Sequence, residues 1–159
     1  MRIGSAVITE NIIERLLTKS DIEQSGGDGR GLNQSIEDLL AFAIAIDNQL
    51  ATTAEALWSV RWTASGKPGM LMTVTRFYEA TDADAALDQI ERGTAYRSME
   101  STIGERSTLA PANADVGAAI TFVRDRAMVS LQLPLASDGS TLLNEQQLLS
   151  LAITIEARL

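Results

Sequence analysis

The feature that most constrains the fold of this chain is a pair of alternating segments joined by a tight turn. Apolar residues occupy every second position from Trp58 to Ala64, and the alternation resumes from Met70 to Tyr78. Such alternation is typical of strands that bury one face. The glycines and proline of residues 65–69 supply the backbone angles that a tight turn needs. The sequence therefore predicts an antiparallel hairpin, and with it a sheet that has one buried face.

Three more strands are predicted downstream. Residues 118–124 and 127–135 read as a second hairpin, because Val129 to Leu135 alternates cleanly and the two segments are close together. Pro134 lacks the N–H group that a sheet ladder requires, so it belongs at a strand end or a sheet edge. Residues 103–109 are expected to add a further strand.

Apolar residues at helical spacing predict helices around these strands. The segments are residues 8–17, the stretch from Ser35 to about residue 50, the stretch after Thr81 and the stretch after Asn144. Ser20 and Glu23 have the spacing of a capping box, so a short turn is expected behind the first helix. The stripe of the last helix that should face the core consists of Leu148, Leu151, Ala152, Ile155 and Leu159.

Together these segments predict a single α+β domain over residues 1–159. The predicted order is α-α-β-β-α-β-β-β-α, a largely antiparallel sheet of about five strands covered by helices. The length of 159 residues and the apolar share of 45% are ordinary for one globular domain. The apolar patch near residues 6–8 is too short for a signal peptide or for a bilayer, so no membrane span is expected in this chain.

The composition excludes several kinds of chemistry. The chain contains no cysteine and no histidine, which rules out disulfides, thiolate nucleophiles, Ser-His-Asp hydrolases and zinc enzymes. Carboxylates alone prefer hard cations, so we expect no transition-metal site and no cofactor. The net charge is −8 and the basic residues are scattered, so nucleic acids and anionic membranes are unfavourable partners.

Two local patterns suggest chemistry but have plainer explanations. The glycine-rich residues 26–31 lack the third glycine of a dinucleotide fingerprint and the lysine of a P-loop, which favours a flexible surface loop. Asp82, Asp84 and Asp88 could hold a cation, but helix capping and a solvated helix face explain all three. No catalytic residue is predicted.

The candidate ligand-binding residues are large side chains that the predicted strands can place on one face, namely Trp62, Met72, Tyr78 and Phe122. A binding pocket there would lie between the sheet and a covering helix. A filled core is the plainer explanation and the favoured one, because such residues usually pack between sheet and helices. Arg61 and Arg76 are expected on the opposite face from Trp62, which makes them poor anchors for an anion inside such a pocket.

Several short motifs follow one another through residues 70–159. They are Phe77-Tyr78 before an Ala-rich helix, Ile103-Gly104-Glu105-Arg106, the hairpin of Ile120 to Arg124 and Val129 to Leu131, and Glu145 to Ala152 with Arg158-Leu159. In these motifs, just over half of the chain resembles the C-terminal part of many bacterial extracytoplasmic proteins, mostly lipoproteins and sensor-type domains of unknown function. Some of those families are similar to the PsbP-like α/β/α sandwich. The resemblance implies an extracytoplasmic location, although this chain has no lipid-attachment cysteine.

These observations favour a non-catalytic binding or protein-interaction domain that acts outside the bacterial cytoplasm on a protein partner or a small apolar ligand. One alternative is a cytoplasmic enzyme, or an enzyme accessory subunit, that uses carboxylates and arginines. Another is a homo-oligomeric structural module, because an exposed sheet edge can pair with a second copy to form a homodimer.

Overall fold

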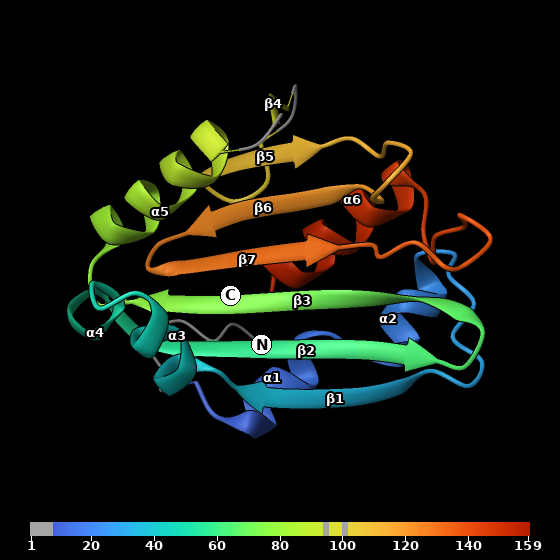
Figure 1. The fold of residues 1–159 in the computed structure, drawn as a ribbon, viewed down its shortest axis with the longest axis horizontal. Coiled ribbons are helices and arrows are strands. Elements are labelled where there is room, and N and C mark those ends of the chain that lie inside the picture. Colours follow the sequence, from blue (N-terminus) through green and yellow to red (C-terminus); the bar gives the residue numbers. More distant parts are fainter. Residues whose placement is uncertain (1–7, 94–95, 100–101) are drawn as a thin grey trace.

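The computed structural model describes residues 8–93, 96–99 and 102–159. In this part of the chain, six longer strands and the two-residue β4 form one sheet in the order β1-β2-β3-β7-β6-β5-β4 (Figure 1). All neighbouring strands run antiparallel. The strands are β1 (Asn33–Asp38), β2 (Ala54–Ala64), β3 (Lys67–Phe77), β4 (Arg97–Ser98), β5 (Arg106–Ala110), β6 (Ala119–Arg124) and β7 (Ala127–Gln132).

Helices lie on both faces of this sheet, so the α+β fold class is confirmed. The face that we call the back face packs against α1 (Glu10–Leu16), α2 (Lys19–Gln24) and α6 (Glu145–Glu156). The opposite face, the front face, carries α3 (Leu40–Ile46), α4 (Leu50–Thr53) and α5 (Ala80–Gly93). In Figure 1 these last three helices gather at the end of the sheet where β2 begins and β3 ends, and the rest of the front face has no helix over it.

The main core lies between the back face and its helices. Val60, Met72, Leu131 and Ile120 stand side by side across four strands and are fully buried. The buried side chains of the two hairpins are therefore those that the alternating apolar pattern predicts. The stripe of α6 is confirmed as well, because Leu148, Leu151, Ala152 and Ile155 are fully buried and Leu159 is nearly so.

The front face of the sheet is largely polar. Across five strands, one row of opposed residues consists entirely of hydroxyl side chains, namely Ser59, Thr73, Ser130, Thr121 and Thr108. The hydroxyl oxygens of Thr121 and Ser130 lie 3.1 Å apart in a hydrogen bond. A second, smaller apolar cluster forms only where α5 packs, with Ala83 and Leu87 against Phe77 and Val123. The buried apolar cluster of the front face is thus confined to the end with the three helices.

The predicted helix that begins at Ser35 is wrong at its start. Residues 33–38 form β1, which pairs with β2 so that Ile36 lies opposite Val60, and the helix begins only at Leu40. The apolar spacing that indicated a helix is real from Leu39 onward. Residues 33–38 instead gain hydrogen bonds from a strand that lies about 20 to 30 residues further along the chain, and a local pattern does not contain that information.

Three smaller predictions also need correction. β2 begins at Ala54, before the expected start of the first hairpin at Trp58. The capping box behind α1 is formed by Thr18 and Asp21, not by Ser20 and Glu23. The strand expected at residues 103–109 is β5, which begins at Arg106. The five predicted strands are all present, and β1 and the two-residue β4 complete the seven-stranded sheet, so the predicted number of about five is close.

Candidate functional site

Three of the four predicted ligand-binding residues meet in the main core. Trp62, Met72 and Phe122 are at most 5% exposed and belong to one cluster on the back face. Tyr78 lies beyond the end of β3 and is about half exposed, and its carbonyl oxygen accepts a hydrogen bond from Arg126. Tyr78 therefore lies outside the cluster that contains the other three residues.

The expected position of Arg76 is wrong. Arg76 lies opposite Ala56 in the register of β2 and β3, on the same back face as Trp58 and Trp62, and its side chain is only 4% exposed. The alternation in β3 already places Arg76 in phase with the buried Val74. Arg61 does lie on the opposite face, where it is exposed.

Arg76 takes part in a charged group at one end of the sheet. The carboxylate of Glu55 is 3.5 Å from Nε of Arg76 and 3.7 Å from Nη1 of Arg126. Glu55 lies where the register of β2 against β3 shifts, so its carboxylate can reach both guanidinium groups. These are ionic contacts between neighbours within the domain.

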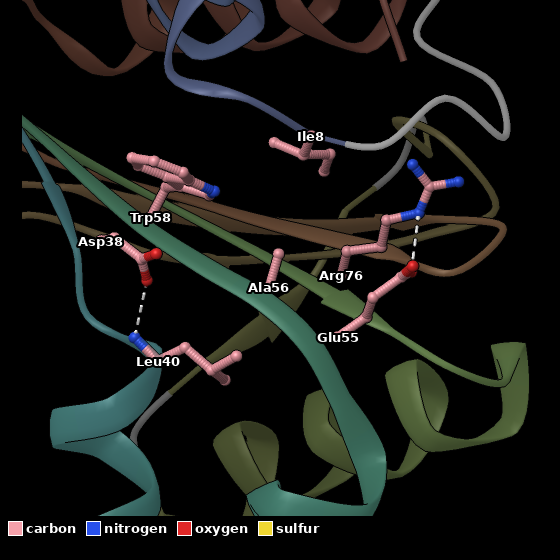
Figure 2. A pocket seen from close by; sticks show the side chains of 7 residues that line it. All are labelled: Ile8, Asp38, Leu40, Glu55, Ala56, Trp58 and Arg76. Atoms are coloured by element: carbon pink, nitrogen blue, oxygen red, sulfur yellow. Dashed lines mark hydrogen bonds and ion pairs between the residues drawn. The ribbon is translucent and has the colours of Figure 1, made fainter.

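A small cavity of about 130 Å³ adjoins this group, and we call it the back pocket. Figure 2 shows its lining of Ile8, Asp38, Leu40, Glu55, Ala56, Trp58 and Arg76. The charged side chains around it have partners already: Glu55 contacts Arg76, and Asp38 accepts a hydrogen bond of 3.1 Å from the N–H of Leu40. The back pocket is small, and its charges are engaged in holding the fold together.

A larger depression lies on the front face between two helices, and we call it the α4–α5 groove. Its volume is about 360 Å³. The strands supply its floor and the two helices its walls, with the lining Leu50, Leu57, Thr75, Phe77, Ala86, Gln89, Ile90, Gly93 and Met128. Thr75 and Gln89 are the polar side chains in this lining, and neither is ionisable. Such a groove can bind apolar groups and orient them with one or two hydrogen bonds.

Helix α3, which contacts α4, carries exposed apolar side chains. All seven of its residues are apolar, and none of them is buried. Phe42 is 66% exposed and Ile46 is 73% exposed. The signal is present in the sequence, because residues 39–46 are an unbroken apolar run with no polar stripe, a pattern expected of a helix that is covered on all sides. In this chain the helix is at the surface.

The aspartates of α5 and the glycine-rich loop, which the sequence offered as possible sites, both form ion pairs within the fold. Arg106 lies within 4 Å of Asp84, Asp88 and Glu91, so one guanidinium group offsets part of the negative charge of these three carboxylates of α5. Among the described residues, no cluster of three or more acidic side chains could hold a metal ion. The glycine-rich loop is tied to the β2–β3 turn, because Asp28 forms ion pairs with both Arg30 and Lys67. The hydrogen bonds from Arg30 hold the pKa of Asp28 well below its usual value.

No protein-family model matches this chain, and no curated protein matches it. In the part of the chain that the structure describes, no helix is long and apolar enough to cross a bilayer. The α4–α5 groove is therefore the feature of this chain that bears most directly on function.

Proposed function

We propose that this chain is a non-catalytic binding domain and that the α4–α5 groove is its ligand-binding surface. The observation that carries the proposal is the lining of the groove, which combines apolar side chains with two uncharged polar groups. A ligand with an apolar body gains free energy by leaving water there, at roughly 25 cal/mol for each Å² buried. Thr75 and Gln89 can then fix its orientation.

The same lining argues for binding over catalysis. Proton transfer needs an ionisable group within reach of the reacting atoms, and the described residues that line the groove include none. The carboxylates and arginines on which the enzyme alternative depends form contacts with one another in the fold, as Glu55 does with Arg76 and Asp88 with Arg106. Binding therefore accounts better for the arrangement.

We further propose that the domain works outside the bacterial cytoplasm. The support is the resemblance of residues 70–159 to extracytoplasmic proteins. Cell fractionation followed by detection with an antibody tests this part. Recovery of the chain with cytoplasmic markers would contradict it.

A neutral apolar dye tests the groove. Nile red should bind the native protein with an increase in fluorescence, and Gly93→Trp should weaken binding by about tenfold, because an indole at the groove mouth competes for the apolar surface. Gly93 suits this change because a Cβ atom there meets nothing within 4 Å. Ser150→Trp, at an exposed position of α6 on the opposite face, is the matched control and should bind as the native protein does. Equal loss in both variants, or no binding by the native protein, would refute the proposal.

A further inference from the structure

Among the described residues that line the α4–α5 groove, Thr75 alone carries a hydroxyl group. Thr75 is only 4% exposed and belongs to the floor of the groove. Its neighbours on the adjoining strands are Leu57 in β2 and Met128 in β7, and both of these apolar residues also line the groove. The fold therefore places a hydroxyl group within an apolar floor.

The hydroxyl group of Thr75 has no hydrogen-bond partner in the part of the chain that the structure describes. Other threonines of the front face differ from it. Thr121 is hydrogen-bonded to Ser130, and the hydroxyl oxygen of Thr108 is enclosed on all sides without a partner. The hydroxyl oxygen of Thr75 is not enclosed in this way, so the small exposed part of Thr75 includes this oxygen and opens into the groove. A ligand that fills the groove can supply the missing hydrogen bond.

Thr73 provides a matched comparison on the same strand. It lies two residues before Thr75 and therefore on the same face of β3. Its neighbours on the adjoining strands are Ser59 and Ser130, and it does not line the groove. Thr73 thus stands in a row of hydroxyl groups, whereas the cross-strand neighbours of Thr75 are apolar. A substitution at Thr73 removes the same chemistry outside the groove.

The charges around the groove restrict the kind of polar group that can reach its floor. The described lining contains no ionisable side chain, so a charged group there would lose its hydration without gaining a counter-ion. Arg126 is engaged elsewhere, with the carbonyl oxygen of Tyr78 at 3.3 Å and the carboxylate of Glu55 at 3.7 Å. Arg92 is exposed on α5 and does not line the groove. The polar group of a ligand that meets Thr75 must therefore be uncharged.

We propose that the ligand of the α4–α5 groove is an uncharged, mostly hydrocarbon molecule with a carbonyl or hydroxyl oxygen, and that Thr75 selects for this oxygen. This inference rests on the function proposed for the groove and adds the ligand class. The hydrocarbon part lies against apolar residues such as Phe77 and Ile90, and the oxygen points to the floor, where the hydroxyl group of Thr75 donates to it. A pure hydrocarbon covers that hydroxyl group without offering it a partner, which costs free energy.

Three small aromatic ligands of nearly the same shape provide the test. Acetophenone carries a carbonyl group, cumene replaces it with a hydrocarbon branch, and benzoate replaces it with a carboxylate. Each is titrated into the whole chain, and the dissociation constant is obtained from the methyl chemical shifts of Leu57 and Met128. Hydrocarbons leave water more readily than ketones do. The measured quantity is therefore the change that each substitution causes in the affinity for one ligand.

Thr75→Val removes the hydroxyl group and nearly preserves the shape of the side chain. It should weaken acetophenone binding by about threefold to tenfold and leave cumene binding unchanged or tighter. Retained cumene binding shows in the same experiment that the groove of the variant is intact. Thr75→Ser keeps a hydroxyl group and should bind acetophenone nearly as the native protein does. Thr73→Val is the control and should change the affinity for neither ligand. Equal effects of Thr75→Val on acetophenone and cumene would overturn the inference.

A second measurement needs no substitution. Acetophenone labelled with ¹³C at its carbonyl carbon reports whether the oxygen accepts a hydrogen bond. When it is bound to the native protein, the chemical shift should stay close to the value in an alcohol. A value close to that in hexane would mean that the oxygen has no donor in the groove, and it would contradict the inference.

Other outcomes separate this inference from the function proposed above. If Gly93→Trp blocks Nile red while acetophenone does not bind up to its solubility limit, the groove remains a binding surface and the ligand class is wrong. If benzoate binds more tightly than acetophenone and Arg92→Gln removes this preference, the ligand is an anion held at the groove mouth, and the inference fails. If neither Nile red nor any of the three ligands binds, the proposed function fails with it.

Discussion

The carboxylate of Asp21 connects α2, near the start of the described chain, to Arg158, near its end. It accepts hydrogen bonds of 2.6 and 2.8 Å from the guanidinium group of Arg158, and it caps α2 together with Thr18. Arg158 also donates to the carbonyl oxygen of Leu16 at the end of α1. Burial acts to raise the pKa of Asp21, but the hydrogen bonds from Arg158 and Thr18 outweigh it and hold that pKa below its usual value.

This lowered pKa predicts a pH dependence of stability. Because the folded pKa lies below the unfolded value of about 3.9, the contribution of Asp21 is complete above about pH 4 and is lost as pH falls through the folded pKa. Asp21→Asn should lower the free energy of unfolding at neutral pH by about 1–3 kcal/mol. It should also make the decline below about pH 4 shallower than in the native protein. Urea melts at several pH values measure both effects. The exposed Glu14→Gln is the control, and a decline as steep in Asp21→Asn as in the native protein would contradict the account.

At the scale of elements, α6 shows how a local capping signal and tertiary packing together determine one helix. Its start is specified locally by Asn144 and Gln147, which exchange the two hydrogen bonds of a capping box at 2.9 and 2.8 Å. Its orientation is specified by the apolar stripe that packs on the back face, where Leu148 and Leu151 are fully buried. Both signals are present in the sequence, and both are confirmed.

Two substitutions measure separately how much packing and capping contribute to the free energy of unfolding. Leu151→Ala should lower the free energy of unfolding by about 2–5 kcal/mol, because it removes buried methyl groups and leaves a cavity. Asn144→Ala should cost about 0.5–2 kcal/mol, since backbone N–H groups at the helix start lose their partner. Ile153→Ala is the control within the same helix, because Ile153 is 57% exposed. A loss in Leu151→Ala no larger than that in Ile153→Ala would show that the stripe does not pack as described.

The elements that the sequence predicted well are those whose signals are local. The β2–β3 and β6–β7 hairpins combine alternation with nearby turns, and both lie close to their expected positions. β1 was missed because its stability depends on pairing with β2, across an intervening pair of helices. The prediction for Arg76 failed for a different reason. Arg76 is two residues from the buried Val74, so the alternation placed it on the buried face, but an arginine is not expected to be buried.

At the scale of the whole molecule, the surface proposed for binding could not be predicted from the sequence. The groove lining comes from α4, β2, β3, α5 and β7, which meet only through the topology of the sheet. Met128 and Leu57 occupy the positions that strand alternation assigns to the less buried face, so nothing local distinguishes them. The apolar run of α3 was visible, but its exposure depends on the absence of any described element packed over it.

Chemical shifts of methyl groups test the groove most directly. Nile red is titrated into protein labelled at the methyl groups of Ile, Leu and Met. The account predicts that the largest shifts occur at Leu50, Leu57, Ile90 and Met128. The signals of Met72 and Leu131, which are fully buried on the back face, should change little. Shifts concentrated at Met72 and Leu131, or at Ile8 beside the back pocket, with Met128 unchanged, would contradict it.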